Sequence, residues 1–518
     1  MVLKRAMAFF LGVLTDELPK QNLNMENFTM LQYFQWYYPA DGSLWNKMKT
    51  EAVELKAFGI DTLWLPPAHK GMEGKTSAGY DVYDHYDLGE FDQKGSVETK
   101  YGTREELLEA VKTAQRAGLQ VYMDIVLNHL GGADETENVQ VRKVNPKNRL
   151  EFTSDTYEIE AYTKFTFPGR AGKYSAFQWD WQCFTGIDFD QAKNESAIFS
   201  IQNQFGEGWQ DILDEENGNY DYLMLADIDF RNPSVTQELK QWGEWFHQTV
   251  NFDGFRLDAI KHMPASFFND WLDHMRAVTQ KELFTVGEYW SPGKLDDMLA
   301  YIEATGGRMS LFDACLQGNF SQASKQGSEY DISKIFEDTL VQSRPELAVT
   351  LVENHDTQPL QSLEQTVEYW FRPLAYAMIL LRGTGYPCIF YPDLYGASYC
   401  DEGKDGEKHE ITLEAVPQIQ TMLGLRKNNL YGQQRNYLDH PNCIGWTLDG
   451  EDERPGSGIA VILSNSEEGY KDMEMGEKFA GKVFVDRLGS VEAEVTINTA
   501  GWGRFYCSGG AVSAYTAN

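Results

Sequence analysis

Three carboxylates stand where short apolar runs end, and they are the first sign of chemistry in this sequence. Asp258 closes Gly-Phe-Arg-Leu-Asp, Glu288 closes Leu-Phe-Thr-Val-Gly-Glu, and Asp356 closes Val-Thr-Leu-Val-Glu-Asn-His-Asp. Barrel enzymes hold their catalytic residues at the carboxyl ends of parallel strands. Two carboxylates in such a place can cleave a glycosidic bond, one acting as acid and one as nucleophile.

The neighbours of these carboxylates favour the same chemistry. Arg256 lies two residues before Asp258, so on a strand both side chains point to one side, and the cation would keep Asp258 ionised. Glu288 is followed by Tyr289 and Trp290, and desolvation by such neighbours raises a carboxyl pKa, as a general acid requires. A structural Arg–Asp pair and a strand-end Glu are the plain alternatives.

Histidines gather near the same strand ends. The chain has nine, and His129, His262 and His355 all fall at or just past the end of a predicted strand. Imidazole nitrogens can hydrogen-bond to sugar hydroxyls. One such histidine is usually structural, and the segment around His355 would also fit an Asx turn. Three histidines converging on one face are harder to explain by packing.

Strand-like and helix-like runs alternate along most of the chain. This alternation predicts a parallel sheet with helical crossovers, and eight such units predict a closed (β/α)8 barrel. The predicted strands are 30–36, 62–66, 119–126, 254–257, 283–286, 309–312, 348–352 and 387–391. The predicted helices are 44–58, 104–117, 235–249, 265–279, 295–303, 332–342 and 367–381.

Two regions break the alternation. Residues 129–230 are rich in Gly, Asn, Asp and aromatic residues and are too long for a structureless loop, so we expect a small inserted domain after the third strand. Residues 426–518 contain short strand-like runs separated by turns, which predict an antiparallel β-sandwich domain. The barrel would then comprise 25–128 and 231–425, and 1–24 would be an extension of uncertain role.

Composition excludes some partners. Asp and Glu total 78 against 45 Lys and Arg, a net charge of −33, which disfavours binding to nucleic acid or to anionic membranes. No apolar stretch approaches the roughly 20 residues of a membrane span. The six cysteines are scattered, which favours free thiols in a reducing compartment, although an even number also permits disulfides.

The amino terminus leaves the compartment open. Lys4 and Arg5 precede an apolar segment, 6–14, which resembles a weak signal peptide, but Asp-Glu-Leu-Pro-Lys follows where a cleavage site should be. We therefore expect a cytoplasmic protein, with secretion as the alternative. We also expect a monomer.

Taken together, the motifs resemble those of the α-amylases of glycoside hydrolase family thirteen, and most of all the bacterial liquefying-type and cytoplasmic members. The matching segments are Asp124-Ile-Val-Leu-Asn-His129, 254–262, Val286-Gly-Glu-Tyr-Trp290 and Glu353-Asn-His-Asp-Thr357. The similarity runs from about residue 30 to the end of the chain.

The resemblance assigns roles by position. It implies that Asp258 is the nucleophile, Glu288 the acid/base, and Asp356 the third carboxylate, which holds substrate hydroxyls. The implied sugar contacts are His129, Arg256 and His355, with Tyr80 stacking on the sugar and Lys261 and Trp290 on the aglycone side. The implied reaction is double displacement with retention, for which the two bond-cleaving carboxyls should lie roughly 5–5.5 Å apart.

The resemblance also implies one calcium ion (Ca²⁺) between the barrel and the inserted domain. Side-chain ligands would be Asn128, Asp221 and Asp227, with the backbone carbonyl of His262, and oxygen donors of this kind suit a hard cation. Turn-forming Asx residues are the alternative reading. Liquefying relatives carry an adjacent metal cluster fed by further aspartates, and those positions here hold Thr185, Gln210 and Arg231, so we expect no such cluster.

The expected activity is endo-acting hydrolysis of internal α-1,4-glucosidic bonds in starch, glycogen or maltodextrins. An α-glucan transferase or a maltogenic enzyme on the same scaffold would carry the same three carboxylates. A non-catalytic glucan-binding protein is a remote alternative, because loss of a carboxylate would be expected in a decayed site.

Overall fold

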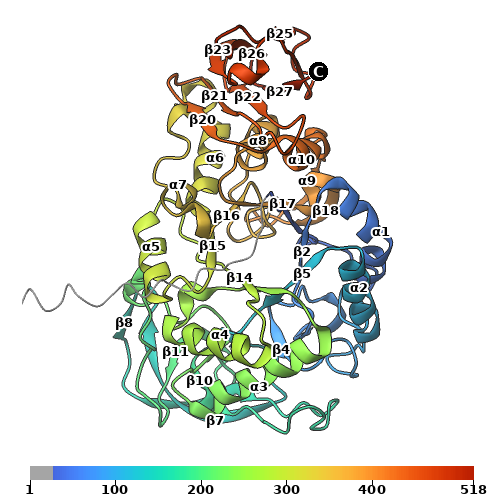
Figure 1. Ribbon diagram of the computed structural model, residues 1–518. Coiled ribbons are helices and arrows are strands. Elements are labelled where there is room, and N and C mark those ends of the chain that lie inside the picture. The colour runs from blue at the N-terminus through green and yellow to red at the C-terminus, as the bar shows by residue number, and fades with distance from the viewer. Residues whose placement is uncertain (1–26) are drawn as a thin grey trace, which may run out of the picture.

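The computed structural model describes residues 27–518, so the expected extension 1–24 lies outside the described residues (Figure 1). Eight parallel strands form a closed barrel in the order β1-β17-β16-β15-β14-β13-β5-β2. The predicted (β/α)8 barrel is confirmed. Its strands are β1 (Met30–Gln32), β2 (Thr62–Leu65), β5 (Gln120–Ile125), β13 (Gly254–Leu257), β14 (Phe284–Gly287), β15 (Ser310–Phe312), β16 (Ala348–Leu351) and β17 (Tyr386–Phe390).

The barrel strands are short and almost entirely buried, as parallel strands covered on both faces must be. Helices pack around them: α1 (Leu44–Phe58), α2 (Arg104–Arg116), α3 (Pro233–Val250), α4 (Ala265–Thr279), α5 (Leu295–Ala304), α6 (Ala314–Gln326), α7 (Leu340–Ser343), α8 (Arg372–Leu380), α9 (Tyr391–Tyr395) and α10 (Gln418–Asn429). Local sequence explains several helix starts. Thr103 and Glu106 form a capping box at the start of α2. Asn232 caps the start of α3, and Pro233 is the first residue of that helix.

Two helix predictions were wrong. Residues 332–342 do not form one helix but a 3₁₀ turn followed by the short helix α7. Asp338, which lies between the two, adopts a positive φ of 53°, and this conformation cannot continue a right-handed helix. The main helix between barrel strands β15 and β16 is instead α6, and Asp313 caps its amino-terminal end. The helix predicted at 367–381 begins only at Arg372, because Pro373 fits the first turn of a helix but not its interior.

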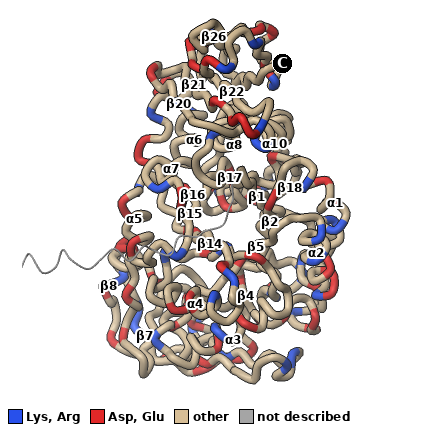
Figure 2. Tube along the Cα trace, viewed as in Figure 1, with Lys and Arg blue, Asp and Glu red and all other residues tan. Residues whose placement is uncertain are grey.

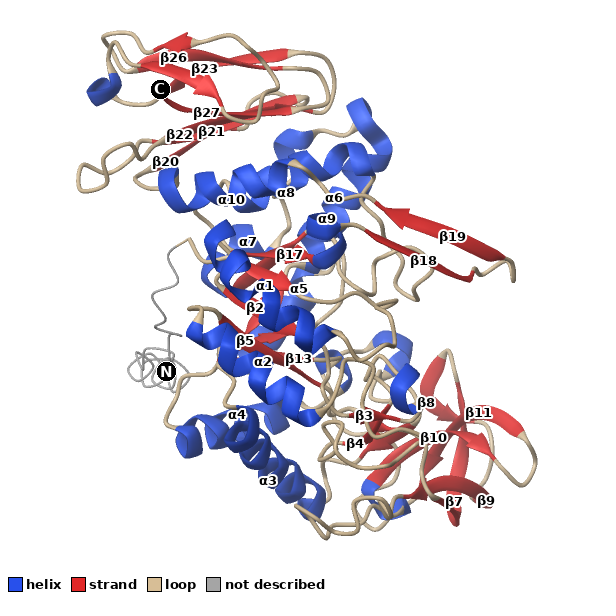
Figure 3. Cartoon of the chain, turned by 90° about the vertical axis from the view of Figure 1, so that its right-hand side faces the viewer, coloured by secondary structure: helices blue, strands red, loops and turns tan. Residues whose placement is uncertain are grey.

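The inserted segment folds into an antiparallel sheet at one end of the barrel (Figure 3). Its strands are β6 (His129–Leu130), β7 (Glu135–Asn145), β8 (Asn148–Phe152), β9 (Tyr157–Lys164), β10 (Phe184–Asp190), β11 (Glu195–Ile201) and β12 (Ala226–Ile228). β12 pairs with β6, which sets Asp227 opposite His129. The end of the insert is thereby tied to the segment that leaves barrel strand β5.

The carboxyl-terminal region is all-β, as predicted, and lies at the opposite end of the molecule (Figures 1 and 3). One sheet contains β20 (Gln434–Tyr437), β21 (Cys443–Leu448), β22 (Ile459–Ser464), β27 (Val512–Ala517), β24 (Val483–Asp486) and β25 (Val495–Thr496), and a second pairs β23 (Gly469–Glu474) with β26 (Trp502–Cys507). Buried residues of the two sheets form a core cluster of their own. Helix α10 runs across the predicted 425/426 boundary.

A hairpin of β18 (Ala397–Glu402) and β19 (Lys408–Leu413), which was not predicted, extends away from the barrel (Figure 3). Acidic residues are spread along the chain over the barrel and both β regions (Figure 2). Within residues 27–518, no helix combines the length and apolar character needed to cross a bilayer.

Candidate active site

The three predicted carboxylates meet in one cavity at the carboxyl ends of the barrel strands. Asp258 follows β13 directly, Glu288 follows β14, and Asp356 lies five residues beyond β16. All three line a cavity of about 600 Å³. Five other predicted residues also line it, namely Tyr80, His129, Lys261, His262 and Trp290.

Arg256 lies behind the cavity and connects its carboxylates. Its Nη1 donates to Asp124 Oδ1 at 2.9 Å and to Asp258 Oδ1 at 2.5 Å, and its Nη2 donates to Glu288 Oε2 at 2.7 Å. Glu288 Oε2 also accepts from the backbone amide of Ala259 at 3.2 Å. Since one planar guanidinium contacts both Asp258 and Glu288, their carboxyl groups are held at one place in a fixed orientation.

Burial sets the protonation of this group. It raises the pKa of Asp258 to about 6, and the Arg256 charge opposes that rise. Burial also raises the pKa of Glu288 above its usual value, and the Arg256 charge again opposes the rise. The pKa of Asp356 is raised well above its usual range by burial and then by the charge of Glu288. Several acids therefore face one built-in cation, and this arrangement favours keeping a proton among them.

His355 offers a hydrogen-bond donor beside Asp356. Its Nδ1 accepts from Gln32 Nε2 at 3.1 Å, so the ring proton resides on Nε2, which lies 3.4 Å from Asp356 Oδ2. Burial lowers the pKa of His355 well below its usual value, which keeps the ring neutral. Nε2 is buried and has no hydrogen-bond partner among the described residues, so this N–H is available to a bound hydroxyl.

Aromatic rings build one side of the site. Tyr80 stacks on His355 with ring centroids 4.9 Å apart, and Trp36 stacks on Tyr80 at 5.7 Å. The Tyr80 hydroxyl donates to Asp124 Oδ2 at 2.8 Å, which fixes the plane of the ring. Trp36 lines the cavity, although it was not predicted as a site residue. Flat rings of this kind can lie against the apolar face of a sugar.

The polar atoms of His129 and Lys261 are engaged by the protein. His129 Nε2 donates to the Tyr80 carbonyl at 2.7 Å, and Asn128 Nδ2 lies 3.3 Å from its Nδ1. Lys261 Nζ lies 3.3 Å from Glu216 Oε2 and 3.5 Å from both the Trp290 carbonyl and Asp214 Oδ2, which accounts for its three N–H donors. Either residue would have to exchange a partner to bind a sugar hydroxyl, whereas His355 would not.

The residues expected to bind calcium lie together beside the cavity. Asn128 Nδ2 donates to Asp227 Oδ1 at 3.2 Å, while Asn128 Oδ1 is buried without a hydrogen-bond partner among the described residues. Asp221 and Asp227 are both buried. Burial raises the pKa of Asp221 to about 7, and burial followed by the Asp221 charge raises that of Asp227 well above its usual range. His262 Nδ1 donates to the carbonyl of Tyr220 at 2.6 Å, which ties this segment to Asp221.

These buried oxygens suit a hard cation, because the hydrogen-bond donors to Asp221 and Asp227 are all neutral and the nearby Asn128 Oδ1 has no partner among the described residues. Across residues 27–518, no three His, Cys, Asp or Glu side chains form a metal-binding group. A cation here would therefore depend on amide and carbonyl oxygens as well as on the two carboxylates.

Thr185, Gln210 and Arg231, the positions at which we expected no adjacent metal cluster, all supply hydrogen-bond donors. Thr185 Oγ1 donates to Asp227 Oδ2. Gln210 donates to Asp221 through its backbone amide at 3.0 Å and its Nε2 at 3.1 Å. Arg231 binds Asp229 through Nε and Nη2, each at 2.8 Å.

Several cavity residues were missed by sequence reasoning. They come from the inserted segment and from the loop after β16: Glu216, Tyr220, Leu223, Met224, Ser362, Leu363, Glu364 and Gln365. They stand in segments without periodicity, so no pattern marks them. Asp124 was recognised only as part of a motif, but a carboxylate on the buried strand β5 is itself a signal, and it contacts Arg256, Tyr80 and Trp64.

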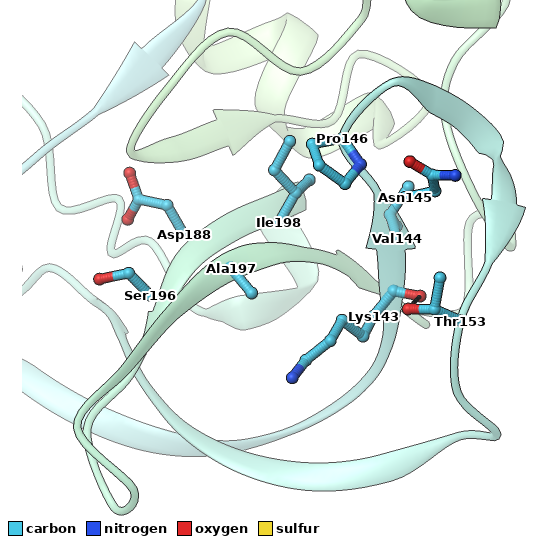
Figure 4. A pocket seen from close by; sticks show the side chains of 9 residues that line it. All are labelled: Lys143, Val144, Asn145, Pro146, Thr153, Asp188, Ser196, Ala197 and Ile198. Carbon is cyan, nitrogen blue, oxygen red and sulfur yellow. Dashed lines mark hydrogen bonds between the residues drawn. The ribbon is translucent and has the colours of Figure 1, made fainter.

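A second cavity, of about 570 Å³, lies on the inserted sheet (Figure 4). Its lining includes Lys143 and Asn145 from β7 and Asp188 from β10. Among the lining residues that the structure describes, there is one carboxylate and no aromatic ring. This cavity is similar in size to the first but lacks the paired acids.

Comparisons with known proteins agree with this geometry. A family model described as alpha amylase, catalytic domain matches residues 52–422, and one described as alpha-amylase C-terminal matches 459–516. The chain is 49% identical to an alpha-amylase of Geobacillus stearothermophilus, covering 94% of this chain and 87% of the relative. It is 47% identical to the cytoplasmic alpha-amylase of Escherichia coli, covering 95% and 99%.

Solved structures show the same fold at lower identity. An Anoxybacillus alpha-amylase aligns with a TM-score of 0.60 at 18% identity, covering 95% of this chain and 97% of that one. A gamma-CGTase of an alkalophilic Bacillus clarkii aligns with a TM-score of 0.63 at 17% identity, covering 96% and 71%. With the catalytic-domain model matched over most of the barrel and two relatives at nearly half identity, the chain belongs to the α-amylase family of glycoside hydrolases.

Proposed function

We propose that this protein is an endo-acting α-amylase that hydrolyses internal α-1,4-glucosidic bonds of starch, glycogen or maltodextrins. The observation that carries the proposal is the guanidinium of Arg256, which holds Asp258 and Glu288 in one cavity at the barrel strand ends. Two carboxyls held in this way can perform a double displacement with retention at the anomeric carbon.

In this proposal, different residues handle the proton, the anomeric carbon and the sugar hydroxyls. Glu288 gives its proton to the leaving oxygen, and the ionised Asp258 attacks the anomeric carbon to form a glycosyl-enzyme. Glu288 then takes a proton from water, which attacks the same carbon and releases Asp258. Asp356 and His355 hold sugar hydroxyls through the transition state, and the Tyr80 and Trp36 rings support the sugar face. Lys261 and Trp290 would contact the aglycone side.

We propose that one calcium ion is held by Asn128, Asp221, Asp227 and the His262 carbonyl. Bound there, it would tie the inserted sheet to the barrel and neutralise two buried carboxylates. The unpartnered Asn128 Oδ1 and the raised pKa values of both aspartates support this assignment. Thr185, Gln210 and Arg231 favour one ion without an adjacent cluster, because they place neutral donors and a cation where a cluster would need carboxylates.

A cytoplasmic location is proposed because a relative covered over almost its whole length is named a cytoplasmic alpha-amylase. The division into barrel, insert (129–230) and β domain (426–518), and the monomeric state, also remain predictions. A product-specific variant of the activity is the second candidate, since a 46% identical relative from Bacillus sp. strain 707, covering 95% of this chain and 93% of the relative, is named a glucan 1,4-alpha-maltohexaosidase.

The test is a digest of soluble starch and of maltoheptaose. Endo-hydrolysis predicts that iodine staining collapses while few reducing ends have appeared, and that maltoheptaose gives only shorter products. Longer chains from maltoheptaose would mean transfer, and a single dominant product would favour the maltohexaosidase type. If wild-type protein releases no reducing ends, the enzyme proposal fails.

A further inference from the structure

Two buried cysteines of the carboxyl-terminal β region occupy facing strand ends. Cys443 is the first residue of β21 in the six-stranded sheet, and Cys507 is the last residue of β26 in the two-stranded sheet. Both belong to the core cluster between the sheets, with exposed fractions of 7% and 1%. The two residues therefore lie on facing sheets, and their strands β21 and β26 lie at the same end of the molecule although they are far apart in the chain (Figure 1).

A glycine makes room for the two sulfur atoms. Gly469, at the start of β23, pairs with Cys507 across the β23–β26 ladder. A Cβ at Gly469 would lie 2.6 Å from Cys443 Sγ and 3.7 Å from Cys507 Sγ, so both sulfurs lie within 4 Å of one point. Any side chain there would collide with Cys443, and glycine is what allows the thiols to approach each other.

The surroundings distinguish the two thiols. The pKa of Cys443 is lowered, first by its hydrogen bond with the Cys507 thiol and to a lesser extent by the charge of Lys471. Burial opposes this shift. The pKa of Cys507 is raised, first by the Cys443 thiol and then by burial. A cysteine with stabilised thiolate next to a second cysteine is the arrangement that thiol–disulfide exchange uses. Both residues stand at strand ends, where local opening is easiest.

We propose that Cys443 and Cys507 form a disulfide when the protein meets a low-molecular-weight disulfide such as oxidised glutathione. The Cys443 thiolate attacks one sulfur of the small disulfide, which releases one small thiolate and leaves a mixed disulfide. Cys507 then loses its proton and attacks the Cys443 sulfur, which releases the second small thiol. Two protein thiols are oxidised to one disulfide, and one small disulfide is reduced to two thiols.

The disulfide would join the two sheets of the sandwich. It would close a long loop of the unfolded chain and so stabilise the carboxyl-terminal region. The catalytic cavity is built from barrel and insert residues, so the cross-link would change stability rather than the active site. This inference is independent of the proposed activity, because it rests on two sulfurs at the other end of the molecule.

The test uses a Cys400→Ser background, because Cys400 is the exposed cysteine of the six and would form intermolecular disulfides. Folded protein is incubated with excess oxidised glutathione, freed of glutathione and denatured at acidic pH, which stops further exchange, before its thiols and mass are measured. The expected result is that titratable thiols fall from five to three and the mass decreases by two hydrogen atoms. A non-reducing peptide map should show one linked pair, Cys443 with Cys507, and the thermal midpoint should rise by several degrees until reductant reverses it.

Two further variants in this background separate the steps. Cys507→Ser should retain glutathione on Cys443 as a stable mixed disulfide. Cys315→Ser, at a buried cysteine of the barrel, should still lose two thiols, from four to two. The proposal is overturned if the Cys400→Ser protein keeps five thiols after incubation, or if the peptide map links any other pair. The peptide map is made on the Cys400→Ser protein alone, so this test does not depend on the folding of the Cys507→Ser or Cys315→Ser variants.

Discussion

Two groups of buried acids lie side by side at the carboxyl end of the barrel, and they differ in the source of their positive charge. In the cavity, Asp258 and Glu288 share the guanidinium of Arg256. Beside it, Asp221 and Asp227 receive neutral donors from Gln210 and Thr185. Burial raises carboxyl pKa values in both groups.

The difference shows how one residue type serves two purposes. A built-in cation holds two carboxyls in place and still allows one to be ionised and the other protonated, as acid–base and nucleophilic work requires. A group without such a cation, but with an unpartnered amide oxygen, is suited to an external one. Asp258 and Glu288 should therefore determine the rate of catalysis, and Asp221 and Asp227 should determine the free energy of unfolding.

The largest effect expected from this comparison is on turnover. Glu288→Gln and Asp258→Asn should each lower kcat on starch by about 10⁴-fold or more, because each removes a group that handles the bond. The matched change Asp227→Asn in the second group should reduce stability more than kcat at low temperature. If Glu288→Gln retained a tenth of wild-type kcat, or Asp227→Asn lost as much as Glu288→Gln, the division of roles would be wrong.

Removing the built-in cation should have the next largest effect. Arg256→Gln should lower kcat by roughly 10²–10³-fold, the size found when a preorganised charge contact is lost. Arg256 lowers the pKa of both Asp258 and Glu288, so the acid limb of the kcat/KM profile should move to higher pH. Arg256→Lys keeps the charge and should move the limb less. An unmoved limb in Arg256→Gln would contradict the account.

The pH dependence of the wild type follows from the same pair. Asp258 attacks only when ionised, and burial raises its pKa to about 6. Below that pH, kcat/KM on a soluble maltodextrin should fall about tenfold per pH unit. At higher pH, kcat/KM should fall again as Glu288 loses its proton. Because Asp258 and Glu288 interact, the two apparent pKa values of this profile describe the pair and not either residue alone. A profile flat from pH 4 to 6 would contradict this assignment.

Removing calcium should have the smallest effect on chemistry and a clear one on stability. A chelator should lower the free energy of unfolding by about 3 kcal/mol relative to protein in calcium at 100 times its Kd. Asp227→Asn should abolish that difference in urea titrations with and without chelator. Metal analysis of the purified wild type should give one calcium ion per chain, and three tightly bound ions would contradict the assignment.

Much of the barrel was predictable, because buried parallel strands appear as apolar runs and their ends mark the active-site face. Asp258 and Glu288 were therefore found from local sequence alone. The C-terminal sheets were visible as short strands between turns. The contact of Arg256 with Asp124 joins two strands far apart in the chain, and local pattern could not show it.

The rest depended on contacts between distant segments or on irregular backbone. Trp36 and Tyr220 reach the cavity from separate loops, and nothing periodic surrounds them. The positive φ of Asp338, which ends the predicted helix at 332–342, has no strong local signal, since Asp also occurs inside helices. Whether His129 has a free donor depends on where the Tyr80 carbonyl lies, which only the fold determines.

The central claim, that Asp258 is the nucleophile and Glu288 its acid/base partner, is tested most directly by trapping the glycosyl-enzyme. The Glu288→Gln variant, incubated with an activated α-maltosyl fluoride, should accumulate a covalent adduct because hydrolysis of the intermediate needs the missing base. Peptide mass spectrometry should locate the sugar on Asp258. A sugar attached to any other residue, or products of inverted anomeric configuration from wild-type enzyme, would contradict the account.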